Sequence, residues 1–434
     1  MSVNQFIKPI TTKRDGNLHI GGCDLVELAH KFGTPLYVVD EESIRQICRE
    51  YKNAFSNFPN INLMYASKAL CNLAITRILD EEGFGFDCVS AGEIYTVNKS
   101  NVDMSKVLFN GNNKTRKELE LAIDLKIGHF SVDNYHEAEL LNKVAYEKGV
   151  NVDILLRITP GIECHTHEYI QTGQIDSKFG FDMVQIDSAI ELIDSKLKNL
   201  NLKGLHAHIG SQIFELKSYT DEIELLIKEL QRINQKFNLT LDELNIGGGL
   251  GVKYTEDDTP PSVEDFAKVI ITALGDDINR LKIYLEPGRS IISTAGVTLY
   301  TIGSSKETSE GKKYVAIDGG MSDNPRPSMY QAKYTAEVAG INNNELEQVT
   351  IAGRFCESGD ILIENIELPK LNSGDVLCVY NTGAYNYSMA SNYNRVEKPA
   401  MVLVNSAQSD MIVNRESLED LVARENIPDR LKKL

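Results

Sequence analysis

Short apolar runs alternate with amphipathic stretches along the first two thirds of the chain. Each run ends in a polar residue or a glycine. A stretch with helical periodicity follows, as at residues 72–82, 114–125, 135–148 and 218–237. This alternation is typical of parallel strands that are joined by helices. It predicts eight strand ends, at residues 64–68, 86–90, 107–111, 129–133, 154–159, 205–210, 244–249 and 283–288.

The number and spacing of these strands fit one closed barrel. Eight strands with their helices in roughly 250 residues match the size of a (β/α)8, or TIM, barrel. The sequence therefore predicts an α/β fold with such a barrel at residues 34–289. In this fold the carboxyl ends of the strands form the active face. Here those ends carry residues that could converge on one site, namely Lys68, Asp87, Asn110, Asp133, Arg157, His208, Gly247, Gly248, Gly249 and Glu286.

The pattern changes after Arg289. Short apolar runs at residues 297–302, 313–317, 348–351, 376–380 and 399–404 are separated by turns, with few helical stretches between them. Such spacing is typical of antiparallel strands. The sequence therefore predicts a second, mainly antiparallel β domain at residues 290–434. The segment 1–33 precedes the barrel pattern and shows no helical signal of its own, so we expect it to join this second domain.

Composition and charge narrow the possible functions. The 434 residues, 42% of them hydrophobic, exceed the length of most single domains and can form a large core. A formal net charge of −17 argues against nucleic-acid binding, and no apolar run reaches the length of a membrane span. The first residues contain no apolar signal core, and the seven cysteines lack paired spacing. We therefore expect a cytoplasmic protein with reduced thiols.

Lys68 stands directly at the end of an apolar strand, with apolar residues on both sides of it. Most lysines are charged and solvated at the surface. An apolar environment lowers the pKa of a lysine and makes it a better amine nucleophile. Lys68 is therefore a candidate for covalent bonding to a carbonyl group.

Two histidines, His206 and His208, are expected on the same face of one strand. They could be buried and hydrogen-bonded, or they could form a metal site together with Cys164, His165 and His167. The tight two-ligand helix motifs of metal sites are absent, so we expect no metal. A histidine at a strand end can instead stack on a planar ring.

Two later strand ends carry features of a binding site. Gly247, Gly248 and Gly249 follow one strand, and such glycines let backbone N–H groups approach a phosphate. Glu286 ends the next strand, where its carboxylate could hold a ring nitrogen in the protonated form. A plain turn and a surface ion pair are the alternatives for these two features.

The second domain contains three further clusters of chemically useful residues. Arg326 and Tyr330 are suited to bidentate recognition of a carboxylate. Cys356 lies next to Glu357 in a polar setting, unlike a core cysteine, and could donate a proton. The third cluster is the short segment that ends at Tyr385.

Taken together and in this order, these motifs resemble those of the fold-type III pyridoxal-phosphate decarboxylases, and most closely the diaminopimelate decarboxylase family. The resemblance extends from Tyr65 to Tyr385 and includes the segment 163–180. It implies that pyridoxal 5'-phosphate (PLP) is the cofactor and that meso-2,6-diaminopimelate is decarboxylated to L-lysine, the last step of lysine biosynthesis. It also implies a homodimer whose active sites are shared across the interface.

The resemblance assigns a role to each candidate residue. Lys68 would bind PLP as an internal aldimine, His208 would stack on the ring, and Glu286 would bind the ring nitrogen. The phosphate cradle would consist of Ser211, Gly247, Gly248, Gly249 and the backbone of Gly288 and Arg289, with Tyr385 closing it. The substrate would contact Arg289, Arg326, Tyr330, Glu357 and Tyr385. Cys356 and Glu357 would reach in from the partner subunit, Cys356 to transfer the proton and Glu357 to hold the distal ammonium group.

One departure and several rival functions are left open. The family usually has Gly-Pro before the cysteine motif, whereas this chain has Gly353-Arg354-Phe355. An ornithine, lysine or carboxynorspermidine decarboxylase is the alternative within this chemistry. Alanine racemases share the architecture, but Glu286 at the ring nitrogen disfavours them. An inactive binding protein and a metal-dependent hydrolase represent other classes of function.

Overall fold

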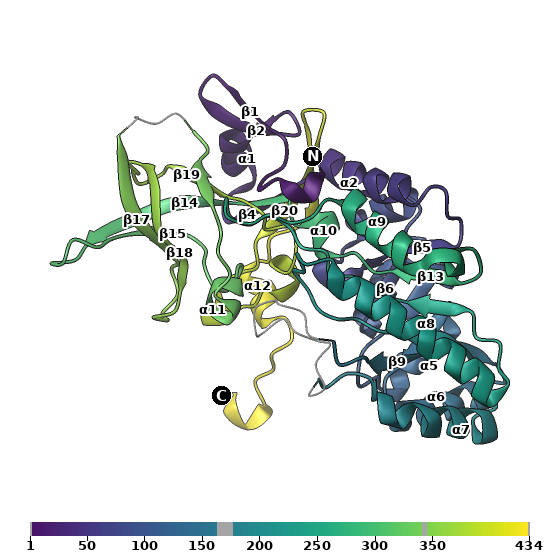
Figure 1. Cartoon of the computed structure of the whole chain (residues 1–434). Coiled ribbons are helices and arrows are strands. Elements are labelled where there is room, and N and C mark those ends of the chain that lie inside the picture. Colours follow the sequence, from purple (N-terminus) through teal and green to yellow (C-terminus); the bar gives the residue numbers. More distant parts are fainter. Residues whose placement is uncertain (1, 163–176, 341–344, 433–434) are drawn as a thin grey trace. The chain divides into compact units, whose positions relative to one another are not determined.

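The computed structural model describes residues 2–162, 177–340 and 345–432, and the chain forms two compact units (Figure 1). The first unit consists of Met1–Ile7 and Ser43–Thr294, and the second of Lys8–Glu42 and Ala295–Leu434.

The first unit is a closed barrel of parallel strands. The strands pair in the spatial order β9, β11, β12, β13, β5, β6, β7, β8. The pairing of β8 with β9 closes the ring. The strand β10 (Phe181–Asp182) adds a short pairing to β9. All eight predicted barrel strands are confirmed: β5 (Ile61–Ala66), β6 (Gly85–Cys88), β7 (Val107–Phe109), β8 (His129–Val132), β9 (Val152–Thr159), β11 (Leu200–His206), β12 (Glu243–Asn245) and β13 (Lys282–Leu285).

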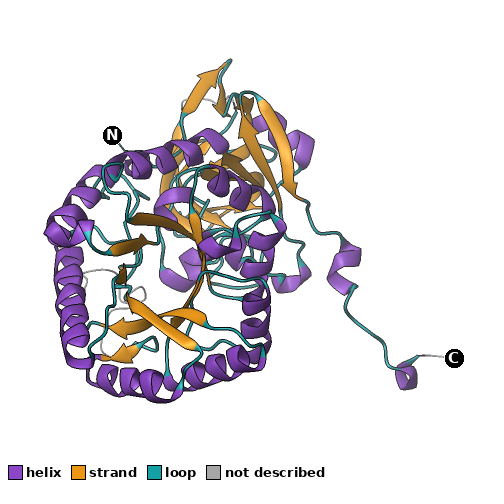
Figure 2. Ribbon diagram, turned by 90° about the vertical axis from the view of Figure 1, so that its right-hand side faces the viewer, coloured by secondary structure: helices purple, strands orange, loops and turns teal. Residues whose placement is uncertain are grey.

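Helices form a ring around these strands (Figure 2). They are α2 (Glu41–Ala54), α3 (Leu73–Glu81), α4 (Ala91–Lys99), α5 (Arg116–Asp124), α6 (Tyr135–Glu147), α7 (Ile186–Lys196), α8 (Lys217–Phe237) and α9 (Val263–Leu274). Several begin shortly after a strand, at a polar residue whose side chain accepts a hydrogen bond from the first turn, as at Asn72, Ser90, Thr115 and Asn134. Among the described residues, no helix is long and apolar enough to cross a membrane.

Apolar side chains fill the inside of the barrel. Met64, Leu108, Leu155 and Tyr284, from four different strands, form one buried cluster. At the carboxyl ends of the strands ionisable side chains are buried as well, including Asp87, His206 and Glu286. Because burial of ionisable groups costs free energy unless they are paired, this change of character marks the functional end of the barrel.

The second unit is built on a mainly antiparallel sheet. Its main path runs in the order β18, β17, β15, β14, β4, β20, β21, while β16 and β19 extend from β14. Of its pairings, β15–β17 and β4–β20 are parallel. The five predicted strands are confirmed as β14 (Gly296–Glu307), β15 (Lys313–Ile317), β17 (Leu346–Ala352), β19 (Val376–Val379) and β20 (Ala400–Asn405). The sequence did not predict β16 (Ala336–Val338), β18 (Ile361–Pro369) or β21 (Gln408–Val413).

The first forty residues differ from expectation in two ways. Residues Leu25–Phe32 form helix α1, which the Asp24 carboxylate caps by accepting from the backbone N–H groups of Val26 and Glu27. The expectation that this segment has no helix is therefore wrong. The strand β4 (Leu36–Asp40) follows the barrel-like alternation in sequence, yet it pairs with β14 and β20 of the second unit. The chain thus begins in the first unit with Met1–Ile7, contributes Lys8–Glu42 to the second unit and returns to the first at Ser43.

Candidate active site

Lys68 lies among ionisable groups that come from several barrel strands. It belongs to the single turn Ser67–Ala69 that follows β5. Its charge interacts with Asp87 at the end of β6, with His208 after β11 and with Glu286 after β13. Because parallel strands place their carboxyl ends at one mouth of the barrel, residues far apart in sequence meet here.

Glu286 is a buried carboxylate with several favourable contacts. Only 5% of the residue is exposed. Its Oε1 accepts a hydrogen bond of 2.6 Å from Nδ2 of Asn245, and its Oε2 lies 3.7 Å from Nε2 of His206. Burial opposes the charge, but His206 and Lys68 hold the pKa of Glu286 well below its usual range. Glu286 is therefore ionised at neutral pH.

The pKa of Asp87 is shifted in the opposite direction from that of Glu286. Burial, together with the charge of Glu286, raises the pKa of this carboxyl group. Neither of its oxygens has a hydrogen-bond partner among the described residues. Two carboxyl groups in one buried site thus differ in protonation because their surroundings differ. The unpaired oxygens of Asp87 indicate that this end of the barrel can bind a further polar group.

The glycine loop after β12 has a backbone that larger residues could not adopt. Gly247 and Gly249 have φ values of +62° and +113°. A Cβ on Gly248 would overlap the carbonyl oxygen of Glu286, and one on Gly249 would lie 2.6 Å from the carbonyl oxygen of Gly210. The loop therefore requires glycine at all three positions.

Protein donors bind the three carbonyl oxygens of this loop. The carbonyl of Gly247 accepts from the Glu286 N–H, that of Gly248 from the Tyr219 hydroxyl, and that of Gly249 from the Ile213 N–H. The oxygens are therefore engaged with the protein and are not directed at a ligand. The N–H groups of Gly247 and Gly248 also donate within the protein, to Oδ1 of Asn245 and Nδ1 of His208. The loop therefore offers an anion space and an absence of facing carbonyl groups.

We expect Gly248→Ala to destabilise the barrel. The new methyl group would meet the backbone of Glu286, directly after β13, and overpacking of this kind costs about 1–3 kcal/mol. Thermal unfolding measures the effect. Gly92→Ala is the matched control, because a Cβ there has its nearest neighbour at 3.7 Å and lies in helix α4. An unchanged melting temperature in Gly248→Ala would contradict this reading of the loop.

Arg289 and Ser211 form a cationic corner beside the glycine loop. Nε and Nη2 of Arg289 donate to the Ser211 hydroxyl at 3.3 and 3.0 Å, and Nη1 donates to the Tyr254 hydroxyl at 2.8 Å. Since the Ser211 oxygen accepts these bonds, its own hydrogen is available to an anion. A Cβ on Gly288 would lie 2.9 Å from Cβ of Ala66, so glycine lets the two strand ends approach each other.

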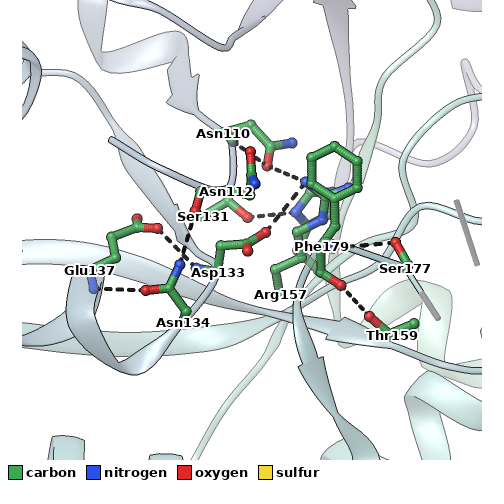
Figure 3. A network of polar contacts seen from close by, with 12 residues as sticks. Asn110, Asn112, Ser131, Asp133, Asn134, Glu137, Arg157, Thr159, Ser177 and Phe179 are labelled. Carbon is green, nitrogen blue, oxygen red and sulfur yellow. Dashed lines mark hydrogen bonds and ion pairs between the residues drawn. The ribbon is translucent and has the colours of Figure 1, made fainter. Parts of the chain in front are cut away.

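Figure 3 shows a second buried cation, Arg157 at the end of β9. Its Nη1 donates to Oδ1 of Asn110 at 3.1 Å and lies 3.7 Å from Oδ1 of Asp133. The centroid of the Phe179 ring lies 4.4 Å from the guanidinium carbon of Arg157. Burial lowers the pKa of Arg157, and the carboxylates of Asp133 and Glu286 oppose that shift. The structure thus joins three strand ends that the sequence placed on the active face.

Three of the predicted substrate-binding residues of the second unit lie on two local structures. Arg326 and Tyr330 belong to the single helical turn α11 (Arg326–Tyr330). Arg326 is 5% exposed and donates from Nη1 to the Tyr334 hydroxyl at 2.7 Å. Tyr385 has a positive φ of +62° in the loop after β19. Such a backbone is uncommon for a bulky residue and marks a functional candidate.

Cys356 and Glu357 lie on an exposed loop that a buried carboxylate anchors. Both residues are exposed. Asp360 accepts hydrogen bonds from the backbone N–H groups of Phe355 and Met321, at 2.8 and 2.7 Å. The N–H of Arg354 donates to the carbonyl of Gly319 at 3.0 Å, a bond that a proline at 354 could not make. The chain's departure from the Gly-Pro pattern therefore adds an anchor to this loop.

The histidines make contacts other than metal coordination. Nδ1 of His206 lies 2.6 Å from the Ser131 hydroxyl, and Nδ1 of His208 accepts from the Gly248 N–H at 3.3 Å. Within the described ranges no cluster of three or more potential metal ligands occurs. Cys164, His165 and His167 lie outside the described residues.

Comparison with known proteins identifies the family. Residues 42–293 match the model of the pyridoxal-binding domain of pyridoxal-dependent decarboxylases. A diaminopimelate decarboxylase of Synechocystis is 45% identical, covering 99% of this chain and 95% of its own length. The diaminopimelate decarboxylase of Bacillus subtilis is also 45% identical, over 94% of each chain. This chain belongs to the diaminopimelate decarboxylase family.

A solved structure of a member of the diaminopimelate decarboxylase family extends the similarity to three dimensions. The M. jannaschii diaminopimelate decarboxylase in complex with L-lysine is 38% identical, with a TM-score of 0.92 and complete coverage of both chains. The TIM barrel and the mainly antiparallel second domain of the present chain are thus those of this family, and PLP is its cofactor.

The residues at the barrel mouth fit the PLP of diaminopimelate decarboxylases. Three glycines leave room that any side chain would fill, and the Ser211 hydroxyl, which accepts from Arg289, has its own hydrogen to donate to a phosphate. The ionised Glu286 offers an acceptor for a ring N–H. Sequence reasoning missed Asn245, Ser131 and Tyr254, which contact Glu286, His206 and Arg289 respectively. Only Asn245 had a signal, since it directly precedes the glycine loop.

Proposed function

We propose that this chain decarboxylates meso-2,6-diaminopimelate to L-lysine and CO2, the last step of lysine biosynthesis, with PLP as its cofactor. The observation that carries the proposal is the 45% identity to diaminopimelate decarboxylases, which extends over both units of the chain. When bound, PLP delocalises the negative charge that the departure of CO2 leaves on the α-carbon. The protein must then position the substrate and manage protons.

The barrel residues hold the reacting end in place. Lys68 provides the amine that binds the cofactor carbonyl, and His208 provides a flat ring on which the cofactor can stack. The Glu286 carboxylate keeps the ring nitrogen protonated, and this makes the ring a better acceptor of negative charge. Ser211, Gly247, Gly248, Gly249, Gly288 and Arg289, with Tyr385 from the second unit, form the proposed phosphate cradle. These assignments agree with the local contacts of the barrel residues.

Return of a proton to the α-carbon needs a positioned acid. The thiol of Cys356 and the amine of Lys68 are the two candidates. A positioned general acid contributes roughly 10²–10⁴-fold in rate. Because Cys356 acts in this proposal as a reduced thiol, we also propose that the enzyme works in the cytoplasm, where thiols stay reduced.

Substrate selectivity depends on the far end of the substrate. Lysine and ornithine present only an ammonium group there, whereas diaminopimelate presents an ammonium group and a carboxylate. We assign Arg326 and Tyr330, together with Arg289 and Tyr385, to carboxylate binding, and Glu357 to the ammonium group. A buried arginine without its carboxylate partner would be left with unsatisfied charge, so substrates that lack the group are disfavoured.

The proposal predicts stoichiometric products. The PLP-loaded protein, supplied with meso-diaminopimelate, should release CO2 and L-lysine in equal amounts, and sodium borohydride should stop the reaction. Isotope-labelled substrate with chromatographic detection of lysine measures this. A protein that binds PLP and diaminopimelate without releasing CO2 would be a binding protein, and the proposal would fail. Release of CO2 from ornithine or lysine at a comparable rate would instead support the more general decarboxylase.

We further propose that the enzyme is a homodimer with shared active sites, in which Cys356 and Glu357 complete the partner's site. Mixtures of inactive Lys68→Ala chains and inactive Cys356→Ala chains should then regain activity. After random subunit exchange about a quarter of all sites would be native. Exchange is checked with two differently tagged chains. Proven exchange without recovered activity would show that each site is built from one chain.

A further inference from the structure

His206 occupies a fully buried position behind Glu286. It is 0% exposed at the end of β11, and Ser131 at β8 is equally buried. Nδ1 of His206 lies 2.6 Å from the hydroxyl oxygen of Ser131. Nε2 lies 3.7 Å from Oε2 of Glu286 and has no hydrogen-bond partner among the described residues. The imidazole therefore connects a hydroxyl group on one side with a carboxylate on the other.

The surroundings determine which nitrogen of His206 carries the hydrogen. Burial lowers the pKa of His206, so the neutral ring has one N–H group and one lone pair. The carboxylate of Glu286 attracts the N–H group and repels the lone pair. The Nε2–H form is therefore favoured, and in that form Nδ1 accepts the hydrogen bond from the Ser131 hydroxyl. The main chain of Ser131 is fixed in turn, because its carbonyl accepts from the buried Lys114 ammonium group at 2.7 Å.

Glu286 needs this support because burial disfavours its charge, while His206 and Lys68 favour it. On one oxygen, Asn245 already donates a hydrogen bond. His206 is the group that faces the other oxygen. If Nε2–H were removed, the carboxylate would become more basic and would compete better for the proton of a ring nitrogen.

We propose that Ser131 and His206 form a relay that acts through Glu286 to keep the cofactor's ring nitrogen protonated, with His206 as a positioning residue. The proposal rests on the assignment of Glu286 to that nitrogen. Without the relay, the proton moves from the ring nitrogen to a carboxylate oxygen of Glu286, which leaves a neutral ring and a neutral carboxyl group. The ring then accepts less negative charge from the α-carbon.

The test uses two amide variants that separate the nitrogens of His206. Glutamine can place an N–H group near the position of Nε2, whereas asparagine reaches only the position of Nδ1. His206→Gln should therefore keep an N–H donor toward Glu286. His206→Asn should lose this donor, although asparagine is as polar as glutamine. The readout is the ¹⁵N chemical shift of the ring nitrogen in protein loaded with ¹⁵N-labelled PLP and no substrate.

The wild type and His206→Gln should both show a protonated ring nitrogen between about pH 6 and 9, within which an unperturbed carboxyl group stays ionised. His206→Asn should show a shift toward the value of a neutral pyridine, with kcat reduced more than KM is raised. Equal ¹⁵N shifts in His206→Gln and His206→Asn, at the value of either a protonated or a neutral ring nitrogen, would overturn the proposal. A merely structural histidine would give that equality.

Ser131→Ala provides a second, milder test that leaves the imidazole in place. Without the hydroxyl, Glu286 still favours the Nε2–H tautomer of His206, but Nδ1 loses its hydrogen-bond donor, so the tautomer is less firmly held and the ring nitrogen should be partly neutral. A wild-type shift in this variant would refute the relay. Because the spectrum is recorded without substrate, it is independent of the proposed reaction. A wild type that binds PLP but does not decarboxylate diaminopimelate would refute the proposed function and leave this test intact.

Discussion

Lys68→Ala is expected to abolish turnover of meso-diaminopimelate. The fall in kcat/KM should be well over 10²-fold, because a single proton-transfer group alone contributes roughly 10²–10⁴-fold. The substitution removes both the amine that bonds to the cofactor and one candidate for the proton-transfer step. In the wild type, borohydride should attach the cofactor permanently to Lys68. Peptide mapping by mass spectrometry measures the attachment, and steady-state kinetics measures the rate.

The control for this prediction is Lys117→Ala. Lys117 is an exposed lysine of helix α5, so its removal should leave both labelling and kinetics unchanged. If the label is found on a lysine other than Lys68, the assignment of the site is wrong. If Lys68→Ala retains more than a few per cent of the activity, the covalent role of this residue is wrong.

Arg326→Ala is expected to lose most of the activity on meso-diaminopimelate while leaving the PLP content unchanged. The loss of a charged partner from a desolvated pair costs about 2–5 kcal/mol, which corresponds to a fall in kcat/KM of more than tenfold. Activity on lysine, which we expect to be very low in the wild type, should change much less, because lysine has no distal carboxylate. The measurement is the ratio of the two kcat/KM values in wild type and variant.

Two observations would contradict the carboxylate role of Arg326. One is an equal loss of activity on diaminopimelate and on lysine, which would indicate a general structural effect. Arg326 is buried and donates to Tyr334, so such an effect must be separated by thermal unfolding. The other is a loss of similar size in Arg14→Ala, in which an exposed arginine of strand β1 (Thr11–Arg14) is removed.

The fold could be predicted from the sequence to a large extent because the barrel repeats one simple pattern. Each strand is short and apolar, and a polar residue shortly after it begins the next helix, as at Asn72 and Ser90. The pattern failed where a strand's partner is distant in sequence. Strand β4 looks like the first barrel strand, but its neighbours β14 and β20 come more than 250 residues later. Local periodicity cannot show such pairings.

The candidate site was less accessible to sequence reasoning than the fold. Lys68, Glu286 and the glycine loop follow strands directly, so their position on the active face was predictable. Ser131, by contrast, is an ordinary residue inside β8, and its contact with His206 depends on the closed barrel. The sequence also could not show that Arg289 turns its guanidinium toward Ser211 and Tyr254. Contacts between side chains of different strands need the three-dimensional arrangement.

We propose that the chain is selective for a substrate that carries an ammonium group and a carboxylate at both ends. The most direct measurement compares kcat/KM for meso-diaminopimelate, L-lysine and L-ornithine with the same PLP-loaded preparation. We expect diaminopimelate to exceed both others by at least about 10²-fold, since a buried charge without its partner costs several kcal/mol. Comparable values for lysine or ornithine would contradict the account and would make the protein a general decarboxylase of basic amino acids.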